Sequence, residues 1–195
     1  MPLIVTQECY LKRLSAYLAA SVSLFGLGAL LGVATIFYLP EVAQHLGASL
    51  AGFVKIFSGL TPLQLAGAIF LNNAIKTLLV IVLGTLFGAI TVLFLVVNGA
   101  ALGIVFYLSI QSRGLWPSLI VLLPHGVLEL PAVLLGAGIG LMLGRHSLNR
   151  LLGESQTSLG SELARALYFF MVVLIPLLLL AALVEAFVTP ALVGF

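Results

Sequence analysis

Long runs without a charged side chain are the feature of this sequence that most limits its fold. Residues 14–39 contain no Asp, Glu, Lys or Arg, and neither do residues 77–97. A helix needs about 20 consecutive apolar residues to cross the hydrocarbon core of a bilayer. Of the 195 residues, 62% are hydrophobic and 7% are charged, whereas roughly a quarter are charged in soluble domains. The chain is therefore predicted to be an integral membrane protein.

The spacing of the apolar runs predicts an all-α fold, a single transmembrane helix bundle of about five spans over residues 1–195. The first span is residues 14–39. Residues 41–58 place apolar side chains at helical intervals among charged ones, as is typical of an amphipathic helix that lies in the membrane interface. Residues 61–64, Thr-Pro-Leu-Gln, form a capping box and predict the start of the second span.

The dipeptide Asn98-Gly99 makes the third span ambiguous, because Asn-Gly is a frequent turn dipeptide. A turn at that point leaves residues 100–110, which are too few to cross a membrane. Either the turn lies earlier in the chain, or residues 99–110 dip into the membrane as a broken or re-entrant segment. Irregular backbone at that depth is tolerated where it is buried in protein or lines water. We therefore expect a short or broken third helix.

The fourth predicted span, within residues 122–144, carries two ionisable side chains. His125 and Glu129 are four residues apart and therefore share one face of a helix. Pro124 and Pro131 flank this pair, and a proline cannot donate to the carbonyl four residues before it. We expect a proline-kinked helix. Ionisable groups in the membrane usually face a bundle interior or a wet cavity.

Glycines spaced four residues apart recur in the predicted spans. Small residues at this spacing let two helices approach closely. The expected role is packing within the bundle, and the alternative is the seam of a homodimer. Besides Gly28 and Gly32, the glycines assigned to helix packing are Gly84, Gly88, Gly99, Gly103, Gly136, Gly140 and Gly144.

Basic residues fall mainly on one side of a five-span topology. Cytoplasmic loops are enriched in Lys and Arg, which predicts a cytoplasmic N-terminus, a cytoplasmic loop at 145–161 and a C-terminus outside, in the inner (plasma) membrane of a cell. The net charge of +2 gives no indication of nucleic-acid binding. Lys12, Arg13, Arg145, Arg150 and Arg165 lie on the predicted inner side, whereas Lys55 and Arg113 lie on the other.

Seven polar residues from several predicted spans are expected to meet at one interior site, because a polar or charged group in lipid is costly without a polar partner. Three of them, His125, Glu129 and Glu185, are also candidate ligands for zinc or another cation. The chain has no His-Glu-x-x-His motif. The predicted site residues are Asn72, Asn73, Lys76, Asn98, His125, Glu129 and Glu185.

Three functions are compatible with such a site. The first is a structural network that fixes the register of the helices. The second is a transport or proton-relay site, and the third is the centre of a metal-dependent intramembrane hydrolase. We assign no catalytic residue, and enzyme activity stays open, although the absence of a recognisable catalytic motif favours a protein without it. No cofactor is expected, with zinc or another cation as the alternative. The expected partners are the bilayer, other membrane or cell-wall proteins and, as a possibility, a second copy of the chain.

The order of several short motifs resembles the stage II sporulation protein M (SpoIIM) family. These motifs are Asn72-Asn73, Asn98-Gly99, Pro124-His125-Gly126 with Glu129-Leu130, and Glu185 with Pro190. The similarity covers about residues 60–190. It implies a small polytopic inner-membrane protein. In spore formers the named member supports a peptidoglycan-degrading complex during engulfment, so the resemblance implies a membrane scaffold of cell-envelope remodelling. A transporter of small solutes or ions is the alternative.

Overall fold

A computed structural model describes residues 2–56 and 59–188. Side chains are described for residues 12–49, 59–120, 122 and 126–188. Within these ranges every regular element is helical, and five helices are long and apolar enough to cross a membrane. The predicted all-α transmembrane bundle is therefore confirmed. The five spans are Lys12–Tyr38, Pro62–Gly84, Ala89–Arg113, Gly126–Leu151 and Leu159–Phe187.

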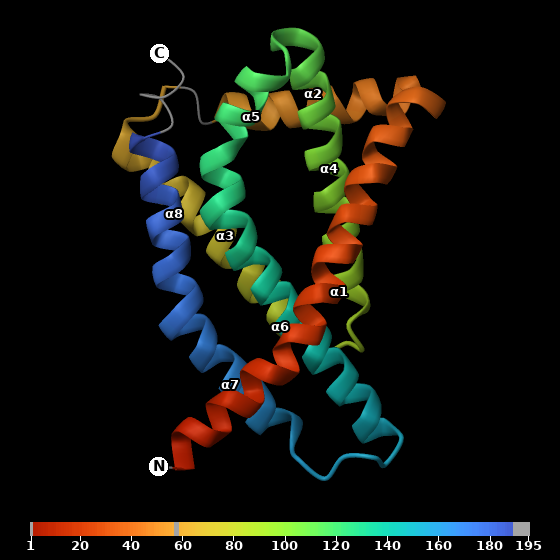
Figure 1. Ribbon diagram of the computed structural model, residues 1–195, viewed down its shortest axis with the longest axis vertical. Coiled ribbons are helices and arrows are strands. Elements are labelled where there is room, and N and C mark those ends of the chain that lie inside the picture. Colours follow the sequence, from red (N-terminus) through yellow and green to blue (C-terminus); the bar gives the residue numbers. More distant parts are fainter. Residues whose placement is uncertain (1, 57–58, 189–195) are drawn as a thin grey trace.

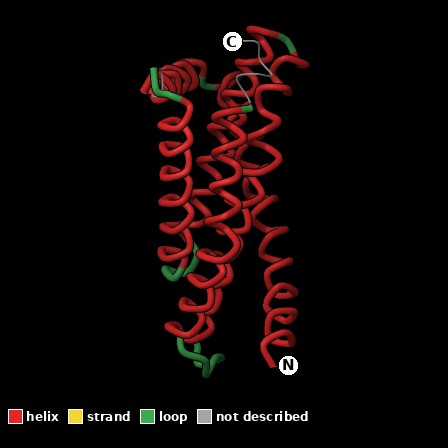
Figure 2. The backbone as a smooth tube through the Cα atoms, turned by 90° about the vertical axis from the view of Figure 1, so that its left-hand side faces the viewer, coloured by secondary structure: helices red, strands yellow, loops and turns green. Residues whose placement is uncertain are grey.

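Most helices run along the long axis of the molecule, and α2 lies across one end of the bundle (Figure 1; Figure 2). The N-terminus lies at the opposite end. In chain order the elements are α1 (Pro2–Tyr38), α2 (Pro40–Ile56), α3 (Pro62–Gly84), α4 (Ala89–Arg113), α5 (Leu115–Pro124), the π-helical turn η1 (His125–Glu129), α6 (Leu130–Leu151), α7 (Leu159–Phe169), the π-helical turn η2 (Phe170–Leu174) and α8 (Ile175–Phe187).

The second and third spans are joined by a short turn at residues 85–88, not at Asn98-Gly99. Phe87 and Gly88 adopt positive φ angles of 57° and 76° in this turn. Helix α4 then continues without interruption from Ala89 to Arg113. The predicted short or broken third helix is therefore wrong, and the turn lies earlier in the chain. Asn98 lies within this helix, and its Nδ2 donates to the carbonyl of Phe94 at 2.8 Å.

A π-helical turn divides the fourth span between Pro124 and Pro131. In a π-helix each N–H donates to the carbonyl five residues back. The N–H of the residue after a proline can therefore donate to the carbonyl that the proline leaves without a donor. A second π-helical turn, η2, precedes Pro176 in the same way, and the N–H of Ile175 donates to the carbonyl of Phe170. Both interruptions thus lie where proline removes a helical donor.

The most extensive helix–helix contact of the bundle joins α1 and α4. A Cβ added to Gly28 or Gly32 would overlap the backbone of α4. A Cβ at Gly99 or Gly103 would overlap the backbone of α1. These four glycines therefore allow the two backbones to touch, as small residues do at helix interfaces in membranes.

A second glycine seam joins α3 and the turn after it to α6. A Cβ added to Gly84 would lie 2.5 Å from the Cα of Gly140, and one on Gly144 would overlap the backbone of Gly88. A Cβ on Gly136 would meet the side chain of Thr77. The predicted glycine faces thus pack within the chain, and a homodimer stays a prediction.

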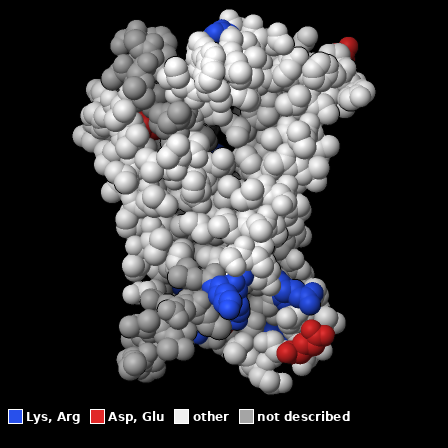
Figure 3. All heavy atoms as spheres, in the orientation of Figure 1, with Lys and Arg blue, Asp and Glu red and all other residues white. Residues whose placement is uncertain are grey.

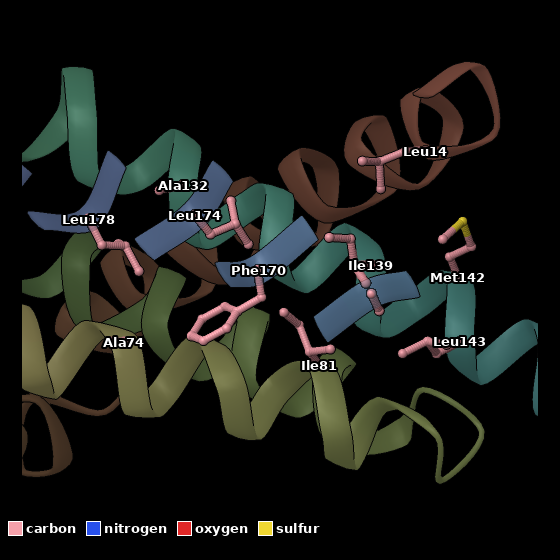
Figure 4. Close-up of a cluster of buried hydrophobic side chains, with 11 residues drawn as sticks. Leu14, Ala74, Ile81, Ala132, Ile139, Met142, Leu143, Phe170, Leu174 and Leu178 are labelled. Carbon is pink, nitrogen blue, oxygen red and sulfur yellow. The ribbon is translucent and has the colours of Figure 1, made fainter. Parts of the chain in front are cut away.

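Apolar side chains of α3, α6, η2 and α8 fill the core between these seams. Figure 4 shows Ile81, Ile139, Phe170 and Leu174 gathered between the helices. Three of these four side chains have no exposed surface, and Phe170 is 4% exposed. Burial of large side chains on both sides of α6 makes this helix the centre of the bundle.

Hydrogen bonds and ion pairs also join helices that are far apart in the sequence. Buried Ser21 of α1 donates from Oγ to the carbonyl of Leu134 in α6 at 3.0 Å. At the N-terminal end of the bundle, Glu162 accepts from Arg13 at 3.0 Å and from Arg165 at 2.9 Å. Glu162 is only 5% exposed, so both arginines are held over the start of α7.

Helix α6 extends to Leu151 and α7 begins at Leu159, so the link between them is shorter than the predicted loop of 145–161. Ser158 caps α7 by accepting from the N–H of Ser161 at 3.1 Å. Most charged side chains on the visible face lie at this end (Figure 3). At the other end, α2 corresponds to most of the helix predicted for residues 41–58. Residues 57–58 of that prediction lie outside the described residues.

Candidate functional site

A cavity of about 170 Å³ lies between α1, α3, α4, η1 and α6. Its polar lining comes from three spans, and its apolar walls come mainly from α1, α4 and α6. This part of the bundle thus leaves space between its helices, whereas at the glycine seams the helix backbones touch. The residues that line it are Phe25, Asn72, Asn73, Lys76, Phe94, Asn98, Leu102, Glu129, Leu130 and Val133.

The cavity lies near mid-depth of the membrane spans. Asn73 is the central residue of α3, which runs from Pro62 to Gly84. Asn98 lies in the first half of α4, close to its centre. Polar groups at this depth are shielded from both aqueous phases, so their preferred partners are one another, water or a polar ligand.

Helical spacing explains why these residues share the cavity. Asn72 and Lys76 are four residues apart on α3, and residues at this spacing lie on one helix face. Phe94, Asn98 and Leu102 repeat the spacing on α4 and all line the cavity. This shared face places the carboxamide of Asn98 between the apolar side chains of Phe94 and Leu102.

The polar groups of the cavity are buried to different extents. Asn73 is 8% exposed and Glu129 is 5% exposed, whereas Lys76 is exposed. The Nδ2 of Asn72 donates to the Oδ1 of Asn73 at 3.2 Å. The Nδ2 of Asn98 donates to the carbonyl of its own helix. The cavity is therefore polar at its α3 and η1 walls and connects to the surface beside Lys76.

Five of the seven predicted site residues line this cavity: Asn72, Asn73, Lys76, Asn98 and Glu129. Glu185 is not among the lining residues. It is half-buried on α8, a helix that packs against α3 and η1. The side chain of His125 lies outside the described residues, although its backbone begins η1. The structure thus brings together the residues of α3, α4 and η1, and the function of the site stays a prediction.

Metal binding is a separate question. Among the described side chains, no three His, Cys, Asp or Glu residues lie close enough together to hold a metal ion. One of the three candidate ligands, His125, has no described side chain, so this observation does not test the predicted set of His125, Glu129 and Glu185. A zinc site therefore stays a prediction.

Sequence reasoning missed the apolar walls of the cavity, notably Phe25 of α1 and Phe94 of α4. The signal for Phe94 was its four-residue spacing from Asn98. Nothing in the sequence indicated Phe25, because its place depends on the close crossing of α1 over α4. The carbonyl of Phe25 is the atom that a Cβ on Gly99 would overlap.

The chemistry of the lining suits a polar occupant without net charge. Lys76 and Glu129 carry opposite charges when ionised, and the three asparagines supply both hydrogen-bond donors and acceptors. A volume of about 170 Å³ corresponds to about six water molecules at ~30 Å³ each. The site can therefore hold a small water cluster or a small polar solute.

These features define an integral membrane protein with a polar cavity at mid-depth of a five-span bundle. The family model described as stage II sporulation protein M, SpoIIM, matches residues 21–190, and the chain belongs to this family. The resemblance seen in the sequence motifs is therefore confirmed. No curated protein and no solved structure matches the chain.

Proposed function

We propose that this chain is a membrane component of cell-envelope remodelling that works through other membrane or cell-wall proteins. The observation that carries the proposal is membership of the stage II sporulation protein M family over residues 21–190, a range that includes the whole cavity lining. As the sequence resemblance implies, the member that names the family supports a peptidoglycan-degrading complex in spore formers. Glycine seams that lock α1 to α4 and α3 to α6 suit a scaffold of constant shape.

The proposed orientation in the inner (plasma) membrane places the N-terminus and the link between α6 and α7 in the cytoplasm. The basic residues at this end support it, because cytoplasmic loops are enriched in Lys and Arg. Arg13, Arg145, Arg150 and Arg165 belong to this end, whereas Arg113 ends α4 on the other side. The end of α8 then lies outside.

Deletion of the gene in its host tests the scaffold role. Loss of the protein is expected to change the release of labelled peptidoglycan fragments, and the wild-type chain is expected to restore it. Glu129→Gln removes the negative charge of the cavity with little change in shape, so a scaffold should still restore release. Gly67→Ala is the matched control, because a Cβ at Gly67 meets no atom within 4 Å. Unchanged release after deletion would contradict the proposal.

The cavity itself favours a second candidate function, the transport of a small polar solute or ion. Membrane-embedded carboxylates beside interrupted helices are typical of transport sites, and here Glu129 ends a π-helical turn. Purified protein in proteoliposomes would then show solute or proton flux that Glu129→Gln abolishes and Gly67→Ala leaves intact. Equal flux in protein-free liposomes would rule this candidate out.

The proposal includes no cofactor and no enzyme activity. Metal analysis of the purified chain tests this directly, because a structural or catalytic zinc remains bound at about one ion per chain. A stoichiometric metal that is lost in His125→Ala would contradict the proposal and favour the hydrolase.

A further inference from the structure

We propose that a second cavity, at the basic end of the bundle, binds an anionic phospholipid through its headgroup phosphate. This cavity has a volume of about 370 Å³ and lies between the α3–α4 turn, the end of α6 and the start of α7. It shares no residue with the polar cavity at mid-depth and does not depend on the function proposed above. Its lining residues are Thr85, Phe87, Ser147, Arg150, Leu151 and Leu159.

This cavity lies at a step in the surface of the bundle, where α6 extends beyond the α3–α4 turn. Gly144 of α6 lies against Gly88 in the α3–α4 turn, and α6 continues to Leu151. At 1.5 Å per residue, α6 extends about 10 Å beyond the turn. Both backbone views show the α6–α7 link farther along the long axis than the turn (Figure 1; Figure 2). The cavity therefore lies where a span leaves the hydrocarbon region, at the depth of lipid headgroups.

The α6 side of the cavity offers donors for a phosphate. The Nη1 of Arg150 donates to the carbonyl of Thr157 at 2.5 Å, which fixes the guanidinium over the cavity. A guanidinium has five N–H donors, so others remain for a phosphate, which arginine binds in a bidentate manner. Ser147 is 8% exposed, and its hydroxyl has no hydrogen-bond partner among the described residues.

The cavity also has an apolar and exposed lining. Phe87 is 58% exposed and Leu151 is 72% exposed. Phe87 also holds its backbone at a φ of 57°, a left-handed conformation that is rare for a bulky residue. A free phosphate would contact only the donors, whereas a phospholipid would cover the aromatic ring with an acyl chain.

The charge of this end favours an anionic headgroup over a zwitterionic one. Arg145 and Arg165 lie at the same end as Arg150, outside the cavity lining. Basic residues near an anionic membrane surface attract it by about 1 kcal/mol each. The end as a whole therefore concentrates anionic lipid, and Arg150 is the residue that would contact it specifically.

Native mass spectrometry of the full-length protein in detergent tests the proposal. Phosphatidylglycerol, phosphatidylcholine and inorganic phosphate are titrated separately. We expect phosphatidylglycerol to bind at least tenfold more tightly than the other two. Because a hydrogen bond to a charged group is strong, Arg150→Gln should weaken this binding about tenfold. Arg145→Gln removes the same charge outside the cavity and should weaken binding less than Arg150→Gln does, by about fivefold at most.

Phe87→Gly provides a second variant that does not threaten folding, because glycine adopts a positive φ without strain. It should be at least as stable as the wild type and should bind phosphatidylglycerol several-fold more weakly. Equal affinity for phosphatidylglycerol and phosphatidylcholine would overturn the proposal. So would equal losses in Arg150→Gln and Arg145→Gln, unchanged binding in Phe87→Gly, or inorganic phosphate that binds as tightly as the lipid.

Discussion

Gly140→Ala is the substitution that most directly tests how the bundle is held together. Gly140 lies in the middle of α6, opposite both α3 and α4. A Cβ at this position would lie 2.7 Å from the carbonyl oxygen of Val80 and 2.7 Å from the Oγ1 of Thr91. Thr91 itself donates to the carbonyl of Val80 at 3.2 Å. One methyl group therefore meets a hydrogen bond that joins the other two helices.

The size of the effect follows from these distances. Ordinary van der Waals contacts begin at about 3.5 Å, so α3 or α4 must move by about 0.8 Å. Overpacking of this kind costs about 1–3 kcal/mol, and loss of the Thr91 hydrogen bond costs about 1 kcal/mol. The better helix propensity of alanine returns about 1 kcal/mol. We expect the free energy of unfolding to fall by about 1–3 kcal/mol.

Thermal unfolding of the purified protein in detergent measures this change, with the monodisperse fraction as the signal. A loss of 1 kcal/mol lowers Tm by roughly 2–4 °C in a chain of this size. Gly67→Ala is the matched control on α3, because Gly67 is exposed and a Cβ there meets no atom within 4 Å. The control should be as stable as the wild type or slightly more stable.

Equal Tm values for Gly140→Ala and Gly67→Ala would refute the reasoning. That result would mean that α6 does not approach α3 and α4 as closely as the glycine seam requires. A lower Tm in Gly140→Ala alone would support the seam, because both variants make the same chemical change within a helix.

Three further outcomes are expected. Glu162→Gln should lower the free energy of unfolding by about 1 kcal/mol, since it leaves two half-exposed arginines without their shared carboxylate; an unchanged Tm would argue against this fastening of α1 to α7. Ser21→Ala should cost about 1 kcal/mol through loss of the bond to Leu134, which thermal unfolding also measures. Glu154→Cys, in a Cys9→Ser background, should resist a membrane-impermeant thiol reagent in intact cells, and labelling there would reverse the proposed orientation.

The five spans were predictable because their apolar runs are long, whereas the turn between the second and third was not. Residues 85–88 read Thr-Leu-Phe-Gly, and an apolar turn of this composition resembles the helices on either side of it. Asn98-Gly99 looked like a turn because both residues favour one in water. In the bundle Asn98 bonds to its own helix and Gly99 admits the backbone of α1, so both serve the helix instead.

Of the residues that line the polar cavity, only the polar and charged ones were predictable from the sequence. Asn72, Lys76 and Glu129 stand out within apolar spans, and the expense of burying them in lipid indicated a common location. Phe25 could not be found in this way, because an apolar residue is at no disadvantage anywhere in a membrane helix. The cavity at the basic end was also beyond prediction, since it depends on how far α6 extends past the α3–α4 turn.

The two π-helical turns have a consequence for comparing this chain with its relatives. Each turn accommodates one residue more than the α-helix around it, which rotates every later side chain by about 100° around the axis. A relative that lacks Pro131 and forms continuous α-helix keeps the same residues facing inward only if it is one residue shorter at η1. An alignment with such a relative therefore needs a single-residue gap at the position of the π-helical turn.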